Sequence, residues 1–245
     1  MAMAAMGAES ELVVRGKLAY QRADFKDAVK LFEQAATADP LNSNVQHWLG
    51  RAYGRMAETS SFLSAPRYAS RCHQAFERAV ELDPKNLEAW NDLFSYYLEA
   101  PGFMGGGLDK AENAATHIAA LNTAEGHYAR AQLAEKRKDF TGAEEELNRA
   151  VELGPQAVGR LVDLAVFLAK RGKRAPSDAA FERAAALDAS HPRYLFERAQ
   201  VLVNEKRQPE EARRLLELYL KAKLGPEDAS PEEARKLLAQ LPPKK

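Results

Sequence analysis

The sequence predicts an all-α fold built from stacked helix pairs, because of its composition and an internal repeat. Of the 245 residues 46% are hydrophobic and only 8% aromatic, and Ala, Leu, Glu, Lys and Arg far outnumber Val and Ile. This composition favours helix over strand. Four similar segments, each ending an amphipathic pattern, read FEQAATADP, FERAVELDP, LNRAVELGP and FERAAALDA and begin at residues 32, 76, 147 and 181. Such recurrence is typical of helical-repeat arrays.

One position in each repeat, occupied mostly by a small residue, sets the register of the repeat. The equivalent residues, with two weaker copies included, are Ala35, Ala79, Ile118, Ala150, Ala184 and Tyr219, spaced by 44, 39, 32, 34 and 35 residues. Most copies end in Pro, which cannot continue a helix. A further amphipathic helix precedes each copy, and Gly16 and Gly50 hold equivalent places in the first two. Each repeat is therefore expected to be a helix pair.

This pattern resembles the tetratricopeptide repeat, a helix–turn–helix unit of about 34 residues. The resemblance covers about residues 11–222 and implies a right-handed α-solenoid. A plain helical bundle is the alternative, but bundles have no fixed period. The expected pairs occupy residues 11–42, 43–86, 87–123, 124–157, 158–191 and 192–226, and residues 227–245 form a capping helix and tail. Ser230 and Pro231 are typical of the start of that helix.

Two insertions interrupt the regular period. The second repeat is ten residues longer than the norm of about 34, and we expect Ser64 to cap a second helix that runs unbroken to Leu82, with Pro66 in its first turn. The third repeat carries EAPGFMGGGLDKAE at the same place. The two segments are expected to form one lobe that exposes Phe62, Leu63, Tyr68, Phe103 and Met104. These side chains either bind a partner or pack against one another.

In tetratricopeptide proteins the first helix of each repeat lines a concave groove. With Gly16 and Gly50 as equivalents, the groove residues expected here are Lys17, Tyr20, Gln21, His47, Arg51, Arg55, Asn91, Tyr128 and Gln132, with Val162, Val166 and Phe196 added by the last two repeats. The groove thus begins basic, which suits an acidic peptide segment because Arg offers a planar fork of donors. Val13 and Glu88 occupy positions where receptors of chaperone tails need cations or amides, which disfavours that role.

The composition and the motifs of the sequence argue against several classes of function. Lys and Arg number 35, as do Asp and Glu, and a zero net charge argues against a nucleic-acid binder. The single cysteine, Cys72, excludes an internal disulfide framework. No nucleophile elbow, phosphate loop or paired His metal motif is present. The longest apolar stretch, Leu161–Ala169, is about half the length of a membrane span. We therefore predict no catalytic residue, metal, cofactor or membrane span.

The predicted function is a non-catalytic scaffold or adaptor that binds a protein or peptide in the groove, on the inserted lobe or on both. The alternative is a periplasmic accessory of a solute (TRAP-type) transport system that binds a small ligand or a transporter component, since some lipoproteins of such systems have similar degenerate repeats. Residues 1–10, MAMAAMGAES, are either a disordered start of a cytoplasmic protein or the remnant of a truncated signal peptide, which would make the protein periplasmic. The oligomeric state is left open.

Overall fold

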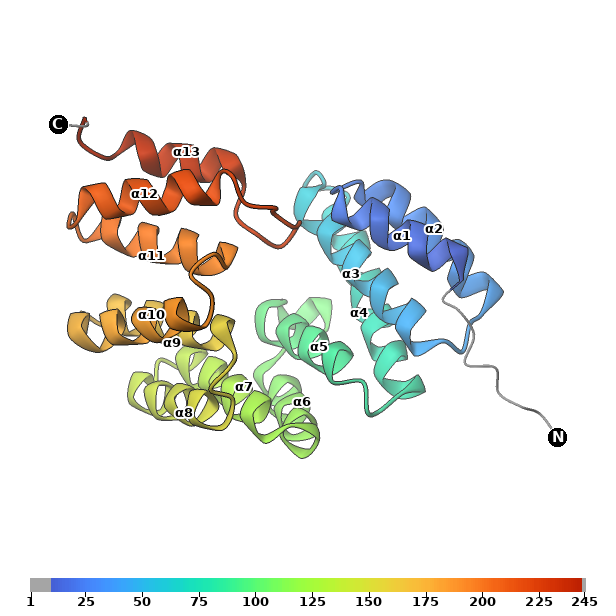
Figure 1. Ribbon diagram of the computed structural model, residues 1–245. Coiled ribbons are helices and arrows are strands. Elements are labelled where there is room, and N and C mark those ends of the chain that lie inside the picture. Colours follow the sequence, from blue (N-terminus) through green and yellow to red (C-terminus); the bar gives the residue numbers. More distant parts are fainter. Residues whose placement is uncertain (1–9, 244–245) are drawn as a thin grey trace. The chain divides into compact units, whose positions relative to one another are not determined.

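The computed structural model describes residues 10–243, and these residues form α-helices and one short 3₁₀ helix but no strand (Figure 1). The helices divide into two compact units: unit 1 ends at Asn122 and unit 2 begins at Thr123. Each unit is a stack of helix pairs, so the predicted all-α class is confirmed. The expectation for the first ten residues falls, except for Ser10, outside the described part of the chain.

Unit 1 contains three helix pairs, and the second helix of each of its first two pairs contacts the first helix of the next. The bounds are α1 Glu11–Gln21, α2 Phe25–Ala38, α3 Ser43–Thr59, α4 Ala65–Leu82, α5 Leu87–Glu99 and α6 Leu108–Leu121, with the 3₁₀ helix η1 at Gly102–Met104.

Unit 2 also contains three helix pairs and ends in a capping helix. The bounds are α7 Thr123–Lys136, α8 Phe140–Leu153, α9 Val158–Lys170, α10 Arg174–Asp188, α11 Pro192–Asn204, α12 Pro209–Tyr219 and α13 Pro231–Ala239. The cap begins as predicted: Ser230 Oγ accepts a hydrogen bond from the Glu233 backbone N–H, and the Glu233 side chain bonds back to the Ser230 backbone. This reciprocal arrangement satisfies donors that a helix start leaves unpaired.

In the first two pairs a glycine on the first helix faces a phenylalanine on the second. A Cβ atom added at Gly16 would lie 2.6 Å from Phe32 Cε1, and one added at Gly50 would lie 2.4 Å from Phe76 Cδ1. Both rings are buried, as is Phe181 of α10. The glycines therefore permit a close approach that any side chain would prevent.

Neighbouring pairs are joined by a polar contact that recurs in both units. A side chain on a first helix donates to an acid that lies 20 residues earlier, on the second helix of the preceding pair. The contacts are Tyr53–Glu33, Tyr97–Glu77 at 3.0 Å and Arg198–Asp178.

The insertion in the second repeat lengthens both of its helices. α4 begins after Ser64, has Pro66 in its first turn and ends at Leu82, as predicted. However, the Ser64 hydroxyl does not cap the helix, because its backbone is already helical and its Oγ donates to the Ser61 carbonyl at 3.2 Å. α3 and α4 have 17 and 18 residues, compared with 11 and 14 for α1 and α2.

Candidate functional site

The first helices of unit 2 form the walls of an open groove of about 340 Å³. We call this surface the unit 2 groove. α7, α9 and α11 supply most of it, and the lining residues are Tyr128, Ala131, Gln132, Glu135, Leu147, Asp163, Val166, Phe167, Lys170, Arg193, Glu197 and Gln200. The predicted groove residues Tyr128, Gln132 and Val166 lie among these lining residues.

A network of charged and aromatic side chains fixes the walls of this groove relative to one another. Asp163 on α9 accepts a hydrogen bond from the Tyr128 hydroxyl of α7 at 2.7 Å and pairs with Arg193 of α11. The Arg160 guanidinium lies 3.4 Å from the centre of the Tyr128 ring and pairs with Glu125 of α7. Three successive first helices are therefore joined by direct contacts.

Burial shapes the electrostatics of the groove. Desolvation raises the pKa of the Asp163 carboxyl above its ordinary value, although Arg193, Tyr128 and Arg160 all act to lower it. Desolvation likewise raises the pKa of Glu197, and Arg193 opposes this. The pKa of the Tyr128 hydroxyl is raised by burial and by the adjacent Asp163. A bound cation or proton therefore stabilises each of these two carboxyls more than it would stabilise an exposed carboxyl.

Other polar side chains in the groove are not committed to the fold. Five of them form no hydrogen bond or ion pair with any residue among 10–243: Gln132, Glu135, Lys170, Glu197 and Gln200. They stand beside an apolar floor that includes the buried side chains of Leu147 and Phe167. The groove therefore offers donors and acceptors next to apolar surface, held on a rigid frame.

The predicted basic residues of unit 1 do lie together, on α1 and α3. Lys17 Nζ lies 5.0 Å and the Arg51 guanidinium 4.8 Å from the centre of the Trp48 ring. Arg55 lies over the Phe25 ring at 5.1 Å and pairs with Glu58 at 2.5 Å. We call Lys17, Trp48 and Arg51 the unit 1 cluster.

An acid from the next pair enters this cluster. Asp92 of α5 lies 2.7 Å from His47 Nε2 and 3.7 Å from Arg51 Nε. The cluster is therefore less basic than the sequence predicts, because part of its charge is neutralised within the unit.

Two predicted groove residues of unit 1 are buried, which corrects the sequence-based assignment. Tyr20 is 3% exposed because its ring makes edge contacts with Phe25 and Trp48. His47 is 1% exposed because Asp92 satisfies its Nε2 inside the stack.

The remaining predicted groove residues divide between surface and core. Gln21 is exposed and Asn91 is half-buried, and neither forms a hydrogen bond or ion pair with the unit 1 cluster in the part of the chain that is described. In unit 2 Val162 and Phe196 are buried, not exposed in the groove. Asp163 and Glu197, each one position later, line the groove in place of Val162 and Phe196, whereas Val166 of α9 lines it as expected.

The inserted segments expose some of the predicted side chains and bury others in part. Phe62, Leu63 and Phe103 are 89%, 90% and 88% exposed. Tyr68 is half-buried, with its ring 6.3 Å from that of Tyr53. Met104 is also half-buried. The expectation of full exposure is therefore wrong for these last two residues.

The segment around η1 is anchored to the neighbouring helices. The Met104 carbonyl accepts a hydrogen bond from the Tyr96 hydroxyl at 2.7 Å, and the Tyr96 ring stacks on His73 with 4.8 Å between centres. Gly105 packs against the same His73 ring, since an added Cβ would lie 2.7 Å from it, and its φ of +92° suits glycine.

Sequence reasoning missed Asp163, Arg160 and Arg193, although a signal for the first two was present. Glu125–Arg160 and Tyr128–Asp163 are both separated by 35 residues, about one repeat, and therefore occupy equivalent places on successive first helices. Comparing polar residues one repeat apart would have identified both pairs.

The stacked pairs and the first-helix groove define a helical-repeat protein. A family model described as tetratricopeptide repeat matches residues 13–58 and 105–158, in agreement with the predicted resemblance. Among residues 10–243, none of the helices combines the length and apolar character needed to cross a bilayer.

Solved structures agree on the fold. The tetratricopeptide-repeat protein TTC0263 of Thermus thermophilus aligns with a TM-score of 0.64 at 19% identity, over 80% of this chain and 100% of that one. MamA (41-end) of Desulfovibrio magneticus RS-1 aligns with a TM-score of 0.51 at 13% identity, over 75% and 99% of the two chains.

One curated relative matches in sequence, an uncharacterized protein of Treponema pallidum (strain Nichols). It is 27% identical over 154 residues, which is 60% of this chain. The match spans about half of that relative, 48% of its length.

Proposed function

We propose that this protein is a non-catalytic interaction scaffold that binds a short extended segment of a partner protein in the unit 2 groove. The observation that carries this proposal is the set of uncommitted polar side chains on three successive first helices, beside an apolar floor. Tetratricopeptide repeats support it, because stacked repeats present extended concave surfaces for binding.

The chemistry of the groove suits a peptide backbone. A side-chain amide carries both a donor and an acceptor, as a peptide group does, so it can bond to a main chain without selecting one side chain. Gln132 on α7 and Gln200 on α11 supply such amides from separate walls. Alternate side chains of an extended segment can then reach Val166 and Phe167.

The frame of the groove lowers the cost of binding. Asp163, Tyr128 and Arg193 already hold one another in place, so these walls need little ordering when a segment arrives.

The unit 1 cluster suits an acidic part of the same or another partner. Lys17 and Arg51 both hold their charges over the indole ring of Trp48, which favours these positions. Because Asp92 already neutralises part of this charge, the expected electrostatic attraction is modest.

The test is the affinity of peptides selected from a random library on the intact chain. Replacing both Gln132 and Gln200 with Ala should weaken binding by about tenfold or more, since two hydrogen bonds of about 1 kcal/mol each are lost. Gln156→Ala is the matched control, because Gln156 is exposed in unit 2 outside the groove. Equal loss in the control and the double variant, or no loss in either, would contradict a groove site.

A further inference from the structure

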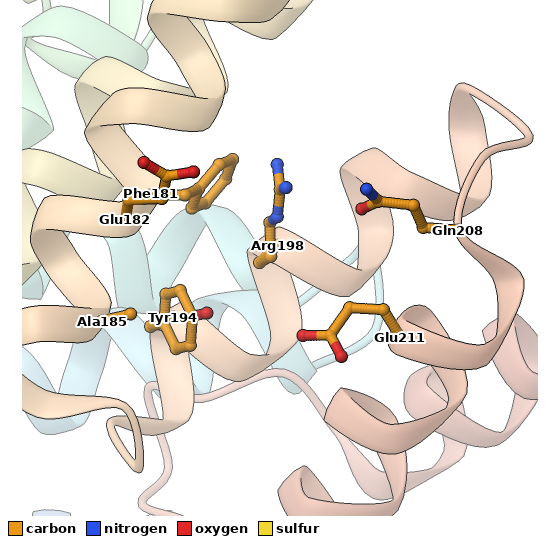
Figure 2. Close-up of a pocket in the computed structure, with 7 residues that line it drawn as sticks. All are labelled: Phe181, Glu182, Ala185, Tyr194, Arg198, Gln208 and Glu211. Atoms are coloured by element: carbon orange, nitrogen blue, oxygen red, sulfur yellow. The ribbon is translucent and has the colours of Figure 1, made fainter.

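Unit 2 contains a second cavity, on a different face of α11 from the groove. This cavity of about 470 Å³ is lined by residues of α10, α11 and α12 and is shown in Figure 2: Phe181, Glu182, Ala185, Tyr194, Arg198, Gln208 and Glu211. We call it the α10–α12 pocket. On α11 it is lined by Tyr194 and Arg198, whereas Arg193 and Glu197 line the groove.

Tyr194 brings a hydroxyl without a protein partner to this pocket. The residue is only 8% exposed, yet its hydroxyl forms no hydrogen bond with any residue between 10 and 243. In Figure 2 the hydroxyl points toward Glu211 across the pocket. The hydroxyl is therefore not committed to the fold, and a ligand in the pocket can bond to it.

Three aromatic rings of unit 2 are covered by a guanidinium. Arg160 lies over Tyr128, Arg171 over Phe140 at 3.9 Å, and Arg198 over Phe181 at 5.0 Å. No cation of the described chain lies over Tyr194, whose ring contact is an edge-on packing with Phe181. One aromatic face that lines a cavity is thus left without the guanidinium that covers its neighbours.

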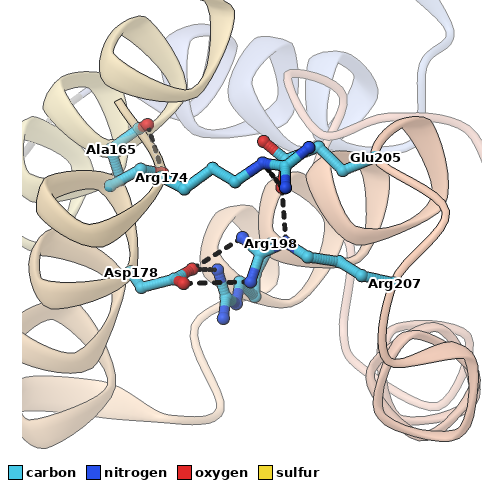
Figure 3. A network of polar contacts seen from close by, with 7 residues as sticks. Ala165, Arg174, Asp178, Arg198, Glu205 and Arg207 are labelled. Atoms are coloured by element: carbon cyan, nitrogen blue, oxygen red, sulfur yellow. Dashed lines mark hydrogen bonds and ion pairs between the residues drawn. The ribbon is translucent and has the colours of Figure 1, made fainter. Parts of the chain in front are cut away.

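The single cation that lines the pocket is committed elsewhere. Figure 3 shows Arg198 paired with Asp178, which also accepts two hydrogen bonds from Arg207 at 2.7 and 2.9 Å. The nearby Arg174 pairs with Glu205 at 3.9 Å in the same view. Arg198 is therefore held at Asp178. Together with a hydrogen bond from Arg214, its charge also helps to keep the pKa of Glu211 below its ordinary value.

Two carboxylates remain at the pocket. Glu182 is exposed and forms no ion pair in the described part of the chain. Glu211 is bonded to Arg214 at 2.7 and 2.8 Å, but a carboxylate has about four acceptor positions and can accept further bonds. The lining thus offers two carboxylates, a hydroxyl and an amide around an uncovered aromatic face.

We propose that the α10–α12 pocket binds the side chain of an arginine in a partner protein. The guanidinium would stack on Tyr194 and donate to Glu182 and Glu211, and the Tyr194 hydroxyl would accept from it. Arg fits better than Lys because its planar, weakly hydrated guanidinium both stacks and binds carboxylates through a fork of donors. This site is independent of the unit 2 groove.

The test uses ¹⁵N-labelled full-length protein and two small probes. N-acetyl-L-arginine amide should shift the backbone amide signals of residues 181–185, 194–198 and 208–211. N-acetyl-L-citrulline amide has nearly the same shape without the charge, and it should bind at least tenfold more weakly. Because this comparison uses the unaltered chain, it does not depend on the folding of a variant.

Two variants localise the effect. Glu182→Gln with Glu211→Gln should weaken binding of the arginine probe by about tenfold, whereas Glu210→Gln, an exposed charge change on α12 outside the pocket, should not. Equal shifts with both probes, or unchanged binding in the double variant, would overturn the proposal. Tighter binding of free L-arginine than of the blocked amide would indicate a free metabolite and contradict a partner side chain.

Discussion

Adding one methyl group at Gly50 tests the packing of the helix pairs most sharply. In the native chain a Cβ at this position would lie 2.4 Å from Phe76 Cδ1 and 2.5 Å from Cε1. The Phe76 ring is 5% exposed and cannot move into solvent. Gly54, one turn later on α3, provides a matched control, because its Cβ would meet only Cys72 Sγ at 3.5 Å.

The expected magnitudes follow from two opposing effects. Replacing a helical Gly with Ala stabilises by about 1 kcal/mol through helix propensity. Overpacking a buried site costs about 1–3 kcal/mol. Gly50→Ala should therefore lower the free energy of unfolding by about 0–2 kcal/mol, whereas Gly54→Ala should raise it by up to about 1 kcal/mol, a difference of about 1–3 kcal/mol.

Urea denaturation followed by tryptophan fluorescence is the appropriate assay. The chain has two tryptophans, Trp48 and Trp90, and both lie in unit 1 with Gly50, so the signal reports the unit that is perturbed. Phe76→Leu in the Gly50→Ala background should recover part of the loss, since the smaller side chain relieves the contact. The proposed packing would be refuted if Gly50→Ala were as stable as Gly54→Ala.

Three further predictions concern charge, capping and the unit 1 cluster. Asp178→Asn should lower the free energy of unfolding at pH 7 by about 1–2 kcal/mol. Because hydrogen bonds from Arg207 and Arg198 hold the pKa of this carboxyl below its ordinary value, the stability difference from wild type should shrink as the pH falls through the pKa of the folded state. An equal difference in urea unfolding at pH 7 and at pH 3 would contradict this. Deleting residues 230–245 removes the buried Leu237 from the core of unit 2 and should cause self-association in sedimentation velocity, whereas a monomer with unchanged melting would argue against a cap. Arg51→Gln should weaken binding of a hexaglutamate peptide and reduce its salt dependence, measured by fluorescence anisotropy, and an unaltered salt dependence would remove the unit 1 cluster as an acidic-partner site.

Much of the fold could be predicted because the determinants are local and periodic. Proline and glycine positions, with a small residue at about each 34th place, predict helix pairs without any long-range information. The burial of Phe32, Phe76 and Phe181 follows from the same register. The capping helix could be predicted because Ser230 and Glu233 form a local motif.

The surface positions were harder to predict because contacts from other repeats decide them. His47 occupies a groove position by register, but Asp92, 45 residues later, gives it a partner and allows its burial. Val162 was expected in the groove because the fifth repeat lacks the glycine equivalent to Gly16 and Gly50 that would fix the rotation of α9. That no cation lies over the Tyr194 ring could not be predicted, since it depends on the pairing of the Arg198 side chain with Asp178.

Photo-crosslinking of a library-selected peptide to the intact chain tests the central claim, that the first-helix groove of unit 2 binds a partner segment. With benzophenone placed in turn at each position of the peptide, crosslinks should fall on the groove-facing residues of α7, α9 and α11, such as Gln132, Val166 and Gln200. Successive peptide positions should progress from one helix to the next, because an extended strand advances about 3.3 Å per residue. Crosslinks confined to the exposed side chains Phe62, Leu63 or Phe103 of unit 1 would instead place the interaction on the inserted segments and contradict the claim.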